Sequence, residues 1–237
     1  MTSVLEVVAP QRLGTGFRWL LASSWTSNLG DGLALAAGPL LVASRTDSAF
    51  LISAAALVQW LPPLLFALAA GALSDRLDRR LIVLAVDSAR VVVLVVLAAA
   101  VLSGGVPVAL VLASLFLLAT AEVFADNASA TLLPMLVARD DLAVGNARLM
   151  AGFVTVNQLV GPPLGAALFA AGTAIPFLAQ AVLVGLGAML ISRLVLPTRG
   201  MPADSPSRLR HEVGEGARWV RRHAAVRTLV LTITVST

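Results

Sequence analysis

Long apolar segments alternate with short polar connections along most of the chain. Crossing the hydrocarbon core of a bilayer takes roughly 20 apolar residues in a helix. The pattern predicts six such helices, at 17–43, 49–73, 81–103, 107–137, 145–171 and 174–196. Connections such as SGGVP at 103–107 are short and rich in glycine and proline, as turns are. The sequence therefore predicts an all-α membrane protein whose residues 17–196 form a six-helix bundle.

The regions outside the bundle are polar or incomplete. Residues 1–16 are expected to form a cytoplasmic tail, and the arginine-rich residues 197–224 an amphipathic linker on the membrane surface. The chain becomes apolar again at 225–237, a run that is too short to span the bilayer. This end is predicted to be the truncated start of a seventh helix, and the chain is expected to be either a truncated product or a fragment of a protein about twice as long.

Composition supports a membrane location and argues against catalysis. The chain is 58% hydrophobic and 13% charged, whereas soluble domains are about 45–50% apolar and about 25% charged. Cysteine is absent and only two histidines are present, so we expect no disulfide, no thiol nucleophile and no metal site. The sequence also lacks the common zinc-protease, phosphate-binding and serine-hydrolase motifs. We therefore expect neither an enzyme nor a cofactor.

Arginine is unevenly distributed between the two sides of the predicted bundle. Only Arg45 lies on one side, and Arg90 lies inside the third helix. Cytoplasmic loops are enriched in basic residues, so the arginine-rich side is predicted to be cytoplasmic, with both ends of the bundle there and the bundle in the plasma (inner) membrane. The net charge of +4 then needs no nucleic-acid partner. The arginine-rich side holds Arg12, Arg18, Arg76, Arg79, Arg80, Arg139, Arg148, Arg193, Arg199, Arg208, Arg210, Arg218, Arg221, Arg222 and Arg227.

The connection GALSDRLDRR at 71–80 concentrates charge between two apolar helices. It resembles the signature loop of the major facilitator superfamily at Gly71, Leu73, Ser74, Asp75, Arg76, Asp78, Arg79 and Arg80. Gly71 permits close helix approach, and Asp75 can pair with arginine or with a helix N-terminus. Such a gating loop can latch one conformation and release it in another. The alternative is a basic turn that only sets topology.

The fifth predicted helix carries a second motif, NQLVGPPLGAAL at 157–168. Gly161, Pro162 and Gly165 resemble the Gly-Pro-x-x-Gly element of the superfamily's exporters, with Ala166 where a second glycine is common. Proline bends a helix and small residues let it pack closely. The resemblance implies an antiport motif that favours export over import. The alternative is ordinary packing of small residues.

Two further features place the chain within that superfamily. EVGEGARWVRRH at 212–223 resembles the linker of the enterobactin-exporter-like branch, the transmembrane secretion effectors. The resemblance covers nearly the whole chain and implies the N-terminal half of a twelve-helix transporter, built as two inverted three-helix repeats. A trace of this repeat is visible, because Asp31 precedes Pro39 by the same spacing as Asp126 precedes Pro134. The alternative is that the shared spacing arises by chance, because the chain is built mainly from a few residue types.

Five ionisable residues stand out well inside the predicted spans, where a charge costs about 2.5–3.5 kcal/mol and usually serves function. Asp87 and Arg90 share a face of the third helix and are expected to form an intramembrane ion pair. Glu122 and Asp126 share a face of the fourth helix and are candidates for proton or substrate binding, unless Arg90 approaches and neutralises them. Asp31 is either a cavity residue or a polar contact between helices.

Weaker candidates for the same site are uncharged. They are Asn127 beside Asp126, and Asn157 and Gln158 on the fifth helix. Trp25 and Trp60 are candidates for an apolar wall, although aromatic residues in spans more often pack or anchor the helix at the interface.

The resemblance implies a secondary active exporter that works by alternating access, and the intramembrane carboxylates predict that it is proton-coupled. The resemblance implies a small amphipathic cargo, such as a drug, a secondary metabolite or a siderophore, and hence efflux, antiport and multidrug resistance. The expected partners are the lipid bilayer, protons, the substrate, and a missing C-terminal half or another copy of the chain. The alternative is a non-transporting half-module that acts as a regulatory subunit or an inactive remnant.

Overall fold

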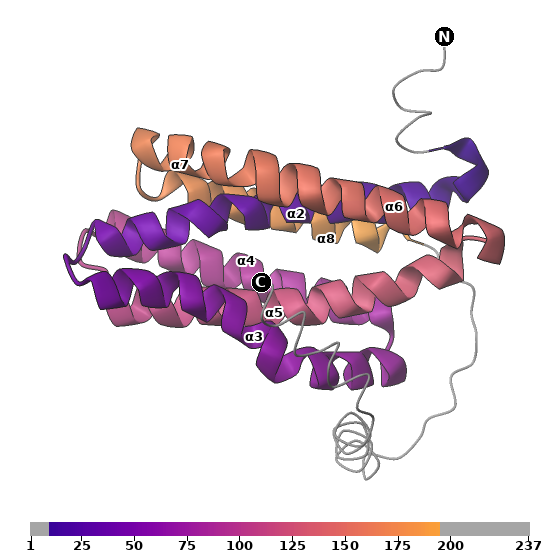
Figure 1. The fold of residues 1–237 in the computed structure, drawn as a ribbon, viewed down its shortest axis with the longest axis horizontal. Coiled ribbons are helices and arrows are strands. Elements are labelled where there is room, and N and C mark those ends of the chain that lie inside the picture. Colours follow the sequence, from indigo (N-terminus) through magenta and orange to yellow (C-terminus); the bar gives the residue numbers. More distant parts are fainter. Residues whose placement is uncertain (1–9, 195–237) are drawn as a thin grey trace, which may run out of the picture.

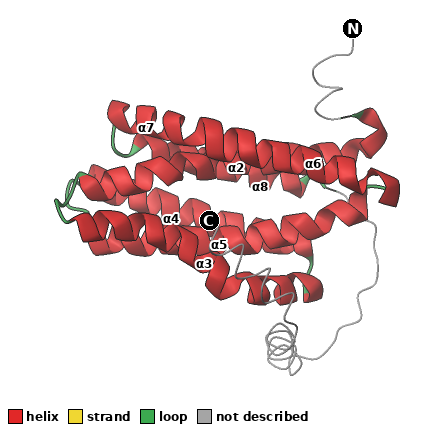
Figure 2. Cartoon of the chain, in the orientation of Figure 1, coloured by secondary structure: helices red, strands yellow, loops and turns green. Residues whose placement is uncertain are grey.

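The structure is a computed structural model that describes residues 10–194, except for the side chains of Gln11 and Arg76. The described residues form helices joined by short loops (Figure 2). Two 3₁₀ turns, one π-helix and seven α-helices follow one another within residues 10–194. They are η1 Gln11–Leu13, α2 Gly14–Ala43, α3 Ala49–Arg76, α4 Arg79–Leu102, α5 Val108–Leu136, η2 Arg139–Asp141, α6 Leu142–Gly152, η3 Phe153–Val160 (the π-helix), α7 Gly161–Ala171 and α8 Ile175–Ser192.

The all-α prediction is confirmed, and six long segments lie where the hydrophobic pattern places them. Segments α6, η3 and α7 run on as one segment of the bundle (Figure 1). Five segments have both the length and the apolar composition of a membrane span. The first, α2, is 30 residues long, but its polar stretch SSWTSNLGD at 23–31 lowers its hydropathy. The predicted linker at 197–224 and the seventh-helix start at 225–237 lie outside the described residues, as do residues 1–9 of the predicted tail.

The bundle has two layers of helices, and the helix contacts follow a matching pattern in both layers. Helices α2, α7 and α8 lie on one side and α3, α4 and α5 on the other (Figure 1). Helix α2 packs on α7 and α8, while α5 packs on α3 and α4, and α4 packs on α8. Exchanging the first three spans for the last three turns the α2 contacts into the α5 contacts and leaves the α4–α8 contact unchanged. Two three-helix repeats produce such a pattern, and it fits half of a major facilitator fold.

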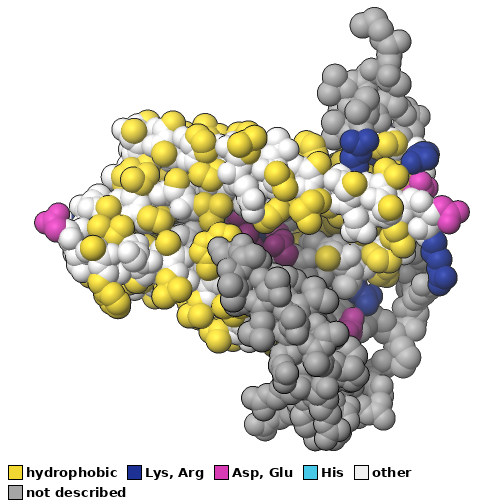
Figure 3. Space-filling model, in the orientation of Figure 1, with side chains coloured by type: hydrophobic (Ala, Val, Ile, Leu, Met, Phe, Trp, Pro, Cys, Tyr) yellow, Lys and Arg dark blue, Asp and Glu magenta, His cyan; other side chains and the backbone are white. Residues whose placement is uncertain are grey.

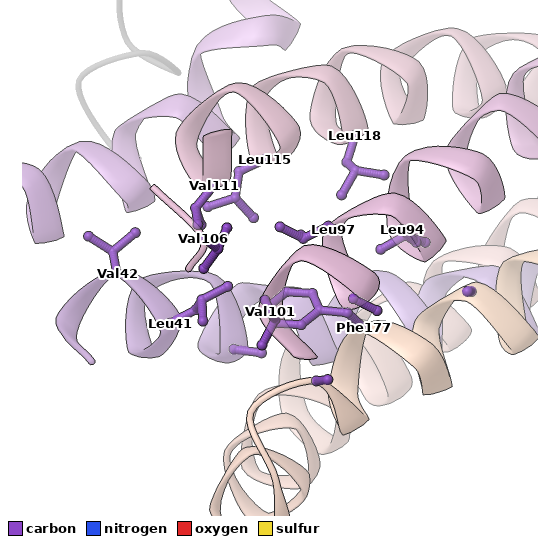
Figure 4. Packing of buried hydrophobic residues seen from close by; sticks show 14 of the residues in the cluster. Leu41, Val42, Leu94, Leu97, Val101, Val106, Val111, Leu115, Leu118 and Phe177 are labelled. Carbon is purple, nitrogen blue, oxygen red and sulfur yellow. The ribbon is translucent and has the colours of Figure 1, made fainter. Parts of the chain in front are cut away.

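Two apolar clusters fill the interior at opposite ends of the helices. One contains Leu41, Leu94, Val101, Leu115 and Phe177 and is drawn in Figure 4. The other contains Phe17, Leu20, Ile82, Leu132 and Ile191. On α2, α4 and α5, the buried or cavity-facing charged residues fall in sequence between the members of the two clusters. The charged layer therefore lies near the middle of the bundle.

The outside of the bundle is apolar along its length. Large side chains such as Phe50, Leu64, Val92 and Leu117 are exposed, and yellow side chains cover much of the face in Figure 3. Basic side chains gather at one end of that face, where the α3–α4 turn and the start of α2 lie; we call this the basic end. This distribution suits a surface in contact with lipid.

Candidate substrate cavity and charged turn

Arg90 is the centre of the charged layer. It belongs to α4, and its side chain is 2% exposed. Its Nη1 donates a hydrogen bond to Asp87 Oδ1 at 3.0 Å, one turn away on the same helix. Its Nη2 forms a second buried ion pair with Asp31 Oδ1 on α2. The Asp87–Arg90 pair expected from the sequence spacing is thus part of a triad that joins two helices.

Gln180 extends this network to α8. Its Nε2 donates to Asp31 Oδ1 at 3.2 Å, and its side chain is 2% exposed. Among the described residues, no group donates to the Gln180 Oε1. Gln180 is not among the residues that the sequence pattern singles out, because an uncharged amide carries a weaker signal than a carboxylate. An isolated glutamine within the apolar segment 175–192 is nevertheless a signal that could have found it.

A cavity of about 180 Å³ lies beside the triad. Six residues that the sequence pattern singles out come together on its wall from α2, α3, α5 and η3. Sequence reasoning missed Gln59, Phe153 and Gln180, which also line this central cavity. The predicted residues are Asp31, Trp60, Glu122, Asp126, Asn157 and Gln158.

Glu122 and Asp126 are one turn apart on α5, and both line the cavity. Within the described part of the chain, neither carboxylate has an ion-pair partner, because Arg90 is paired with Asp31 and Asp87. The alternative that Arg90 neutralises the α5 face by direct pairing is therefore not seen. Figure 3 shows acidic side chains in the middle of the apolar face, away from the basic end.

Two other sequence candidates lie elsewhere. Asn127 does not line the cavity; its Nδ2 donates to Val123 O at 2.8 Å within α5. The reason is rotational, since Asn127 follows Asp126 directly and adjacent helical residues point to different faces. Trp25 packs instead of lining the central cavity, and its Nε1 donates to Arg148 O at 3.1 Å.

The cavity wall formed by Asn157 and Gln158 is π-helical. The Gly161 N–H donates to Val156 O, an i to i−5 bond that closes this segment. Pro162 and Pro163 follow at once and lack the N–H groups that would continue regular α-helical bonding. π-helical segments are rare and frequently mark functional sites. The prolines of the predicted antiport motif thus stand where the π-helix ends.

The glycines of the same motif let two helices touch through their backbones. A Cβ added to Gly32 of α2 would lie 2.9 Å from Gly161 Cα, and one added to Gly165 would lie 2.9 Å from Leu33 Cα. Real Cβ atoms do not come so close to backbone, so each helix would have to shift. This close approach holds Asp31 of α2 beside Asn157.

The family follows from comparison with known proteins. A family model described as transmembrane secretion effector, a branch of the major facilitator superfamily, matches residues 6–235. The chain belongs to this family. It is therefore a multi-pass membrane protein of the transporter class. A search of curated proteins found no match.

The charged turn between α3 and α4 is held by three side chains. Asp78 caps α4, because its Oδ1 accepts from Arg80 N at 2.9 Å and Leu81 N at 3.3 Å. Arg79 lies 3.9 Å from Asp75 across the turn and reaches Met135 Sδ of α5 at 3.5 Å. Arg80 donates through Nη2 to Ser192 O at the end of α8. The turn is thus tied to two neighbouring helices.

One expectation about this turn does not hold for the described residues. A Cβ added to Gly71 would meet nothing within 4 Å, so Gly71 does not bring two helices of this bundle together. The physical reason is that its face of α3 is not covered by another described helix. The side chain of Arg76 lies outside the described part of the chain.

Proposed function

We propose that this chain is one half of a proton-coupled exporter of small amphipathic compounds that works by alternating access. The observation that carries the proposal is the central cavity, where Glu122 and Asp126 lie without an ion-pair partner among the described residues. Intramembrane carboxylates that face a cavity mark proton relays and substrate paths in transporters. Family membership gives the membrane transport class to which this mechanism belongs.

The charge balance of the layer supports coupling between protons and cargo. Asp31, Asp87, Glu122 and Asp126 contribute four carboxyl groups, and Arg90 contributes one guanidinium. Leaving such an excess of negative charge inside a bundle is costly unless a proton or a cation reduces it. A proton arriving at Glu122 or Asp126 would therefore compete with a cationic cargo for the same charge.

The cavity wall suits an amphipathic cargo. Leu35, Leu115, Leu118 and Trp60 offer apolar surface, while the carboxylates and carboxamides lie on the rest of the wall. Ligand cavities combine such apolar walls with a few oriented polar groups. A drug, a secondary metabolite or a siderophore with one polar face fits this description, and export of drugs would produce multidrug resistance.

Alternating access requires a second six-helix bundle against which this one rocks. A C-terminal half or another copy of the chain would supply it. The charged turn would act as the latch, because Arg79 and Arg80 already bridge α4 to α5 and α8 and are placed to exchange partners. The arginines of the basic end favour its placement on the cytoplasmic side of the plasma membrane.

The test is proton flux and ethidium efflux in everted vesicles. We would compare the 237-residue chain alone, the chain joined to a second six-helix half, and the joined protein carrying Asp126→Asn, Asp75→Asn or the control Asp140→Asn. Asp140 is exposed and lies outside the cavity. We expect the joined protein to pump, Asp126→Asn and Asp75→Asn to stop it, and Asp140→Asn to have no effect.

The outcomes separate the candidate functions. Pumping by the short chain alone would mean that copies assemble to replace the second bundle. Dye efflux that persists in Asp126→Asn and in Glu122→Gln would remove the proposed role of these carboxylates. No movement of protons or dye in any form would favour a non-transporting half-module.

A further inference from the structure

A second cavity, of about 430 Å³, opens between α2, α5 and the α6–η3 segment. Its polar wall consists of two hydroxyls and two carboxamides, from Ser24, Asn28, Ser129 and Asn146, together with the carboxyl of Asp126. Asp126 is the one ionisable group among the described residues that line it. The proposed export mechanism does not use this second cavity.

The two cavities are stacked along the helices. On α2 the second cavity is lined by residues within 20–28, whereas the central cavity is lined by residues within 31–35. On α5 the second cavity uses residues 126–130 and the central cavity residues 115–126. Because α2 begins and α5 ends at the basic end, the second cavity lies on that side. A compound entering from the basic end would therefore meet the second cavity first.

Asp126 and Phe153 line both cavities. Phe153 is the first residue of the π-helix and is half-buried. Its aromatic ring is the larger of the two side chains that the walls share, so it lies where the two cavities adjoin. Asp126 is the carboxyl that a ligand could reach from either side.

Among the described residues, one buried hydrogen-bond acceptor without a donor, the Gln180 Oε1, lies on the wall of the central cavity. Buried acceptors are normally satisfied, so it points to a ligand that brings an N–H or O–H group. On the wall of the second cavity, Asn28 is 9% exposed, and its Nδ2 donates to Ser24 O at 2.8 Å and to Ser24 Oγ at 3.3 Å. The hydroxyls, the carboxamides and the Asp126 carboxyl of that wall offer acceptors to the same kind of ligand.

We propose that the second cavity is an entry chamber that binds a hydrogen-bond-donating organic cation, and that Phe153 separates it from the central cavity across a shared Asp126. The inference rests on the proposed export function, because it adds a first binding position to the path that the cargo takes. It assigns Phe153 as a gating residue and the ammonium class as the preferred ligand of the entry chamber.

Single cysteines can test this arrangement directly, because the chain contains none of its own. Ser129→Cys reports on the entry chamber and Ala119→Cys on the central cavity. Each variant, as the 237-residue chain in membrane vesicles, is treated from the basic end with a methanethiosulfonate that carries either an ammonium or a sulfonate group. Labelling needs no transport, so its result is independent of the pumping assay.

Variants that change charge or side-chain size then test Asp126 and Phe153 separately. We expect the ammonium reagent to react faster than the sulfonate at both cysteines, and Asp126→Asn to lower that preference at both by about fivefold through lost Coulomb attraction. Glu122→Gln, which lines the central cavity alone, should lower it at Ala119→Cys and not at Ser129→Cys. Phe153→Ala should speed labelling at Ala119→Cys and leave Ser129→Cys unchanged, with Phe153→Leu in between.

Several results would overturn the inference. Equal rates for the two reagents at Ser129→Cys, or no reaction there, would remove the cation-binding entry chamber. Equal labelling of Ala119→Cys with and without Phe153→Ala would remove the gate. The expected labelling pattern without pumping in any form would retain the two chambers and reject the export function, so the two failures can be told apart.

Discussion

Asp31 in α2 and Asp126 in α5 hold matching places in the two three-helix repeats. Each precedes a proline within its helix by the same spacing, Pro39 in one case and Pro134 in the other. Asp31 is 7% exposed and is bound by Arg90 and Gln180. Asp126 is exposed at the wall of two cavities and has no ion-pair partner among the described residues.

The difference shows how one repeated position can serve two purposes. In the first repeat the carboxylate joins α2 to α4 and α8, so it holds the bundle together. In the second repeat the carboxylate is left open to whatever occupies the cavities. A buried ion pair and an open carboxylate respond differently to substitution, and this contrast can be measured.

The largest expected effect comes from removing the cation of the first repeat. Arg90→Met would leave the buried Asp31 and Asp87 without their guanidinium, and breaking a buried pair in this way costs about 3–5 kcal/mol. We expect the unfolding free energy of the purified chain in mixed micelles to fall by this amount. A fall below about 1 kcal/mol would show that the triad does not stabilise the bundle.

Two controls accompany Arg90→Met. Arg90→Lys keeps the charge but loses the two-pronged geometry, so it should recover part of the stability. The triple variant Arg90→Met, Asp31→Asn, Asp87→Asn removes the unpaired charges and should also be more stable than Arg90→Met alone. If neither variant recovers stability, packing around Arg90 rather than ion pairing is responsible.

The direct comparison of Asp31→Asn with Asp126→Asn should give the next largest difference. Asp31→Asn removes one of two carboxylates from Arg90 and should cost about 1–3 kcal/mol, as for a buried group left without its partner. Asp126→Asn changes an open side chain and should alter stability by about 0.5 kcal/mol or less. Equal losses in the same micelle titration would mean that Asp126 also has a structural role.

A third difference lies directly after each aspartate, where Gly32 follows Asp31 and Asn127 follows Asp126. Gly32 touches Gly161 of α7, so Gly32→Ala would force the helices apart and should cost about 1–3 kcal/mol. Asn127 bonds within its own helix, so Asn127→Ala should cost less. Gly71→Ala, which meets open space, is a matched glycine control for thermal unfolding.

Much of the bundle was predictable because hydrophobic length determines membrane spans. The six spans, the Asp87–Arg90 pair and the shared face of Glu122 and Asp126 follow from spacing along single helices. The sequence marks Asp31, Asn157 and Gln158 as candidates one by one, but it does not predict that they line the same cavity. Spacing within one helix carries no information about which faces of different helices meet.

Three features could not be read from the chain. The π-helix at 153–160 depends on a few hydrogen bonds that shift by one residue, and Pro162 alone predicts only a bend. Gln180 and Phe153 acquire their significance from cavities that form between helices. Gly71 shows the opposite case, since its motif suggests a close contact that this bundle does not make.

The smallest expected effect concerns the caps at the basic end, where Asp78 and Asp141 both precede helices. Asp78 accepts two backbone hydrogen bonds at the start of α4, whereas Asp141 makes no capping bond to α6 and pairs with Arg12 at 3.4 Å. Asp78→Ala should cost about 1 kcal/mol, the usual value of a lost cap. Asp141→Ala should cost about 0.5 kcal/mol or less, because exposed ion pairs contribute little.

If thermal unfolding shows the same loss of stability for Asp78→Ala and Asp141→Ala, the cap is not what distinguishes the two turns. If transport falls in Asp78→Ala by more than its stability explains, the cap itself is part of the latch.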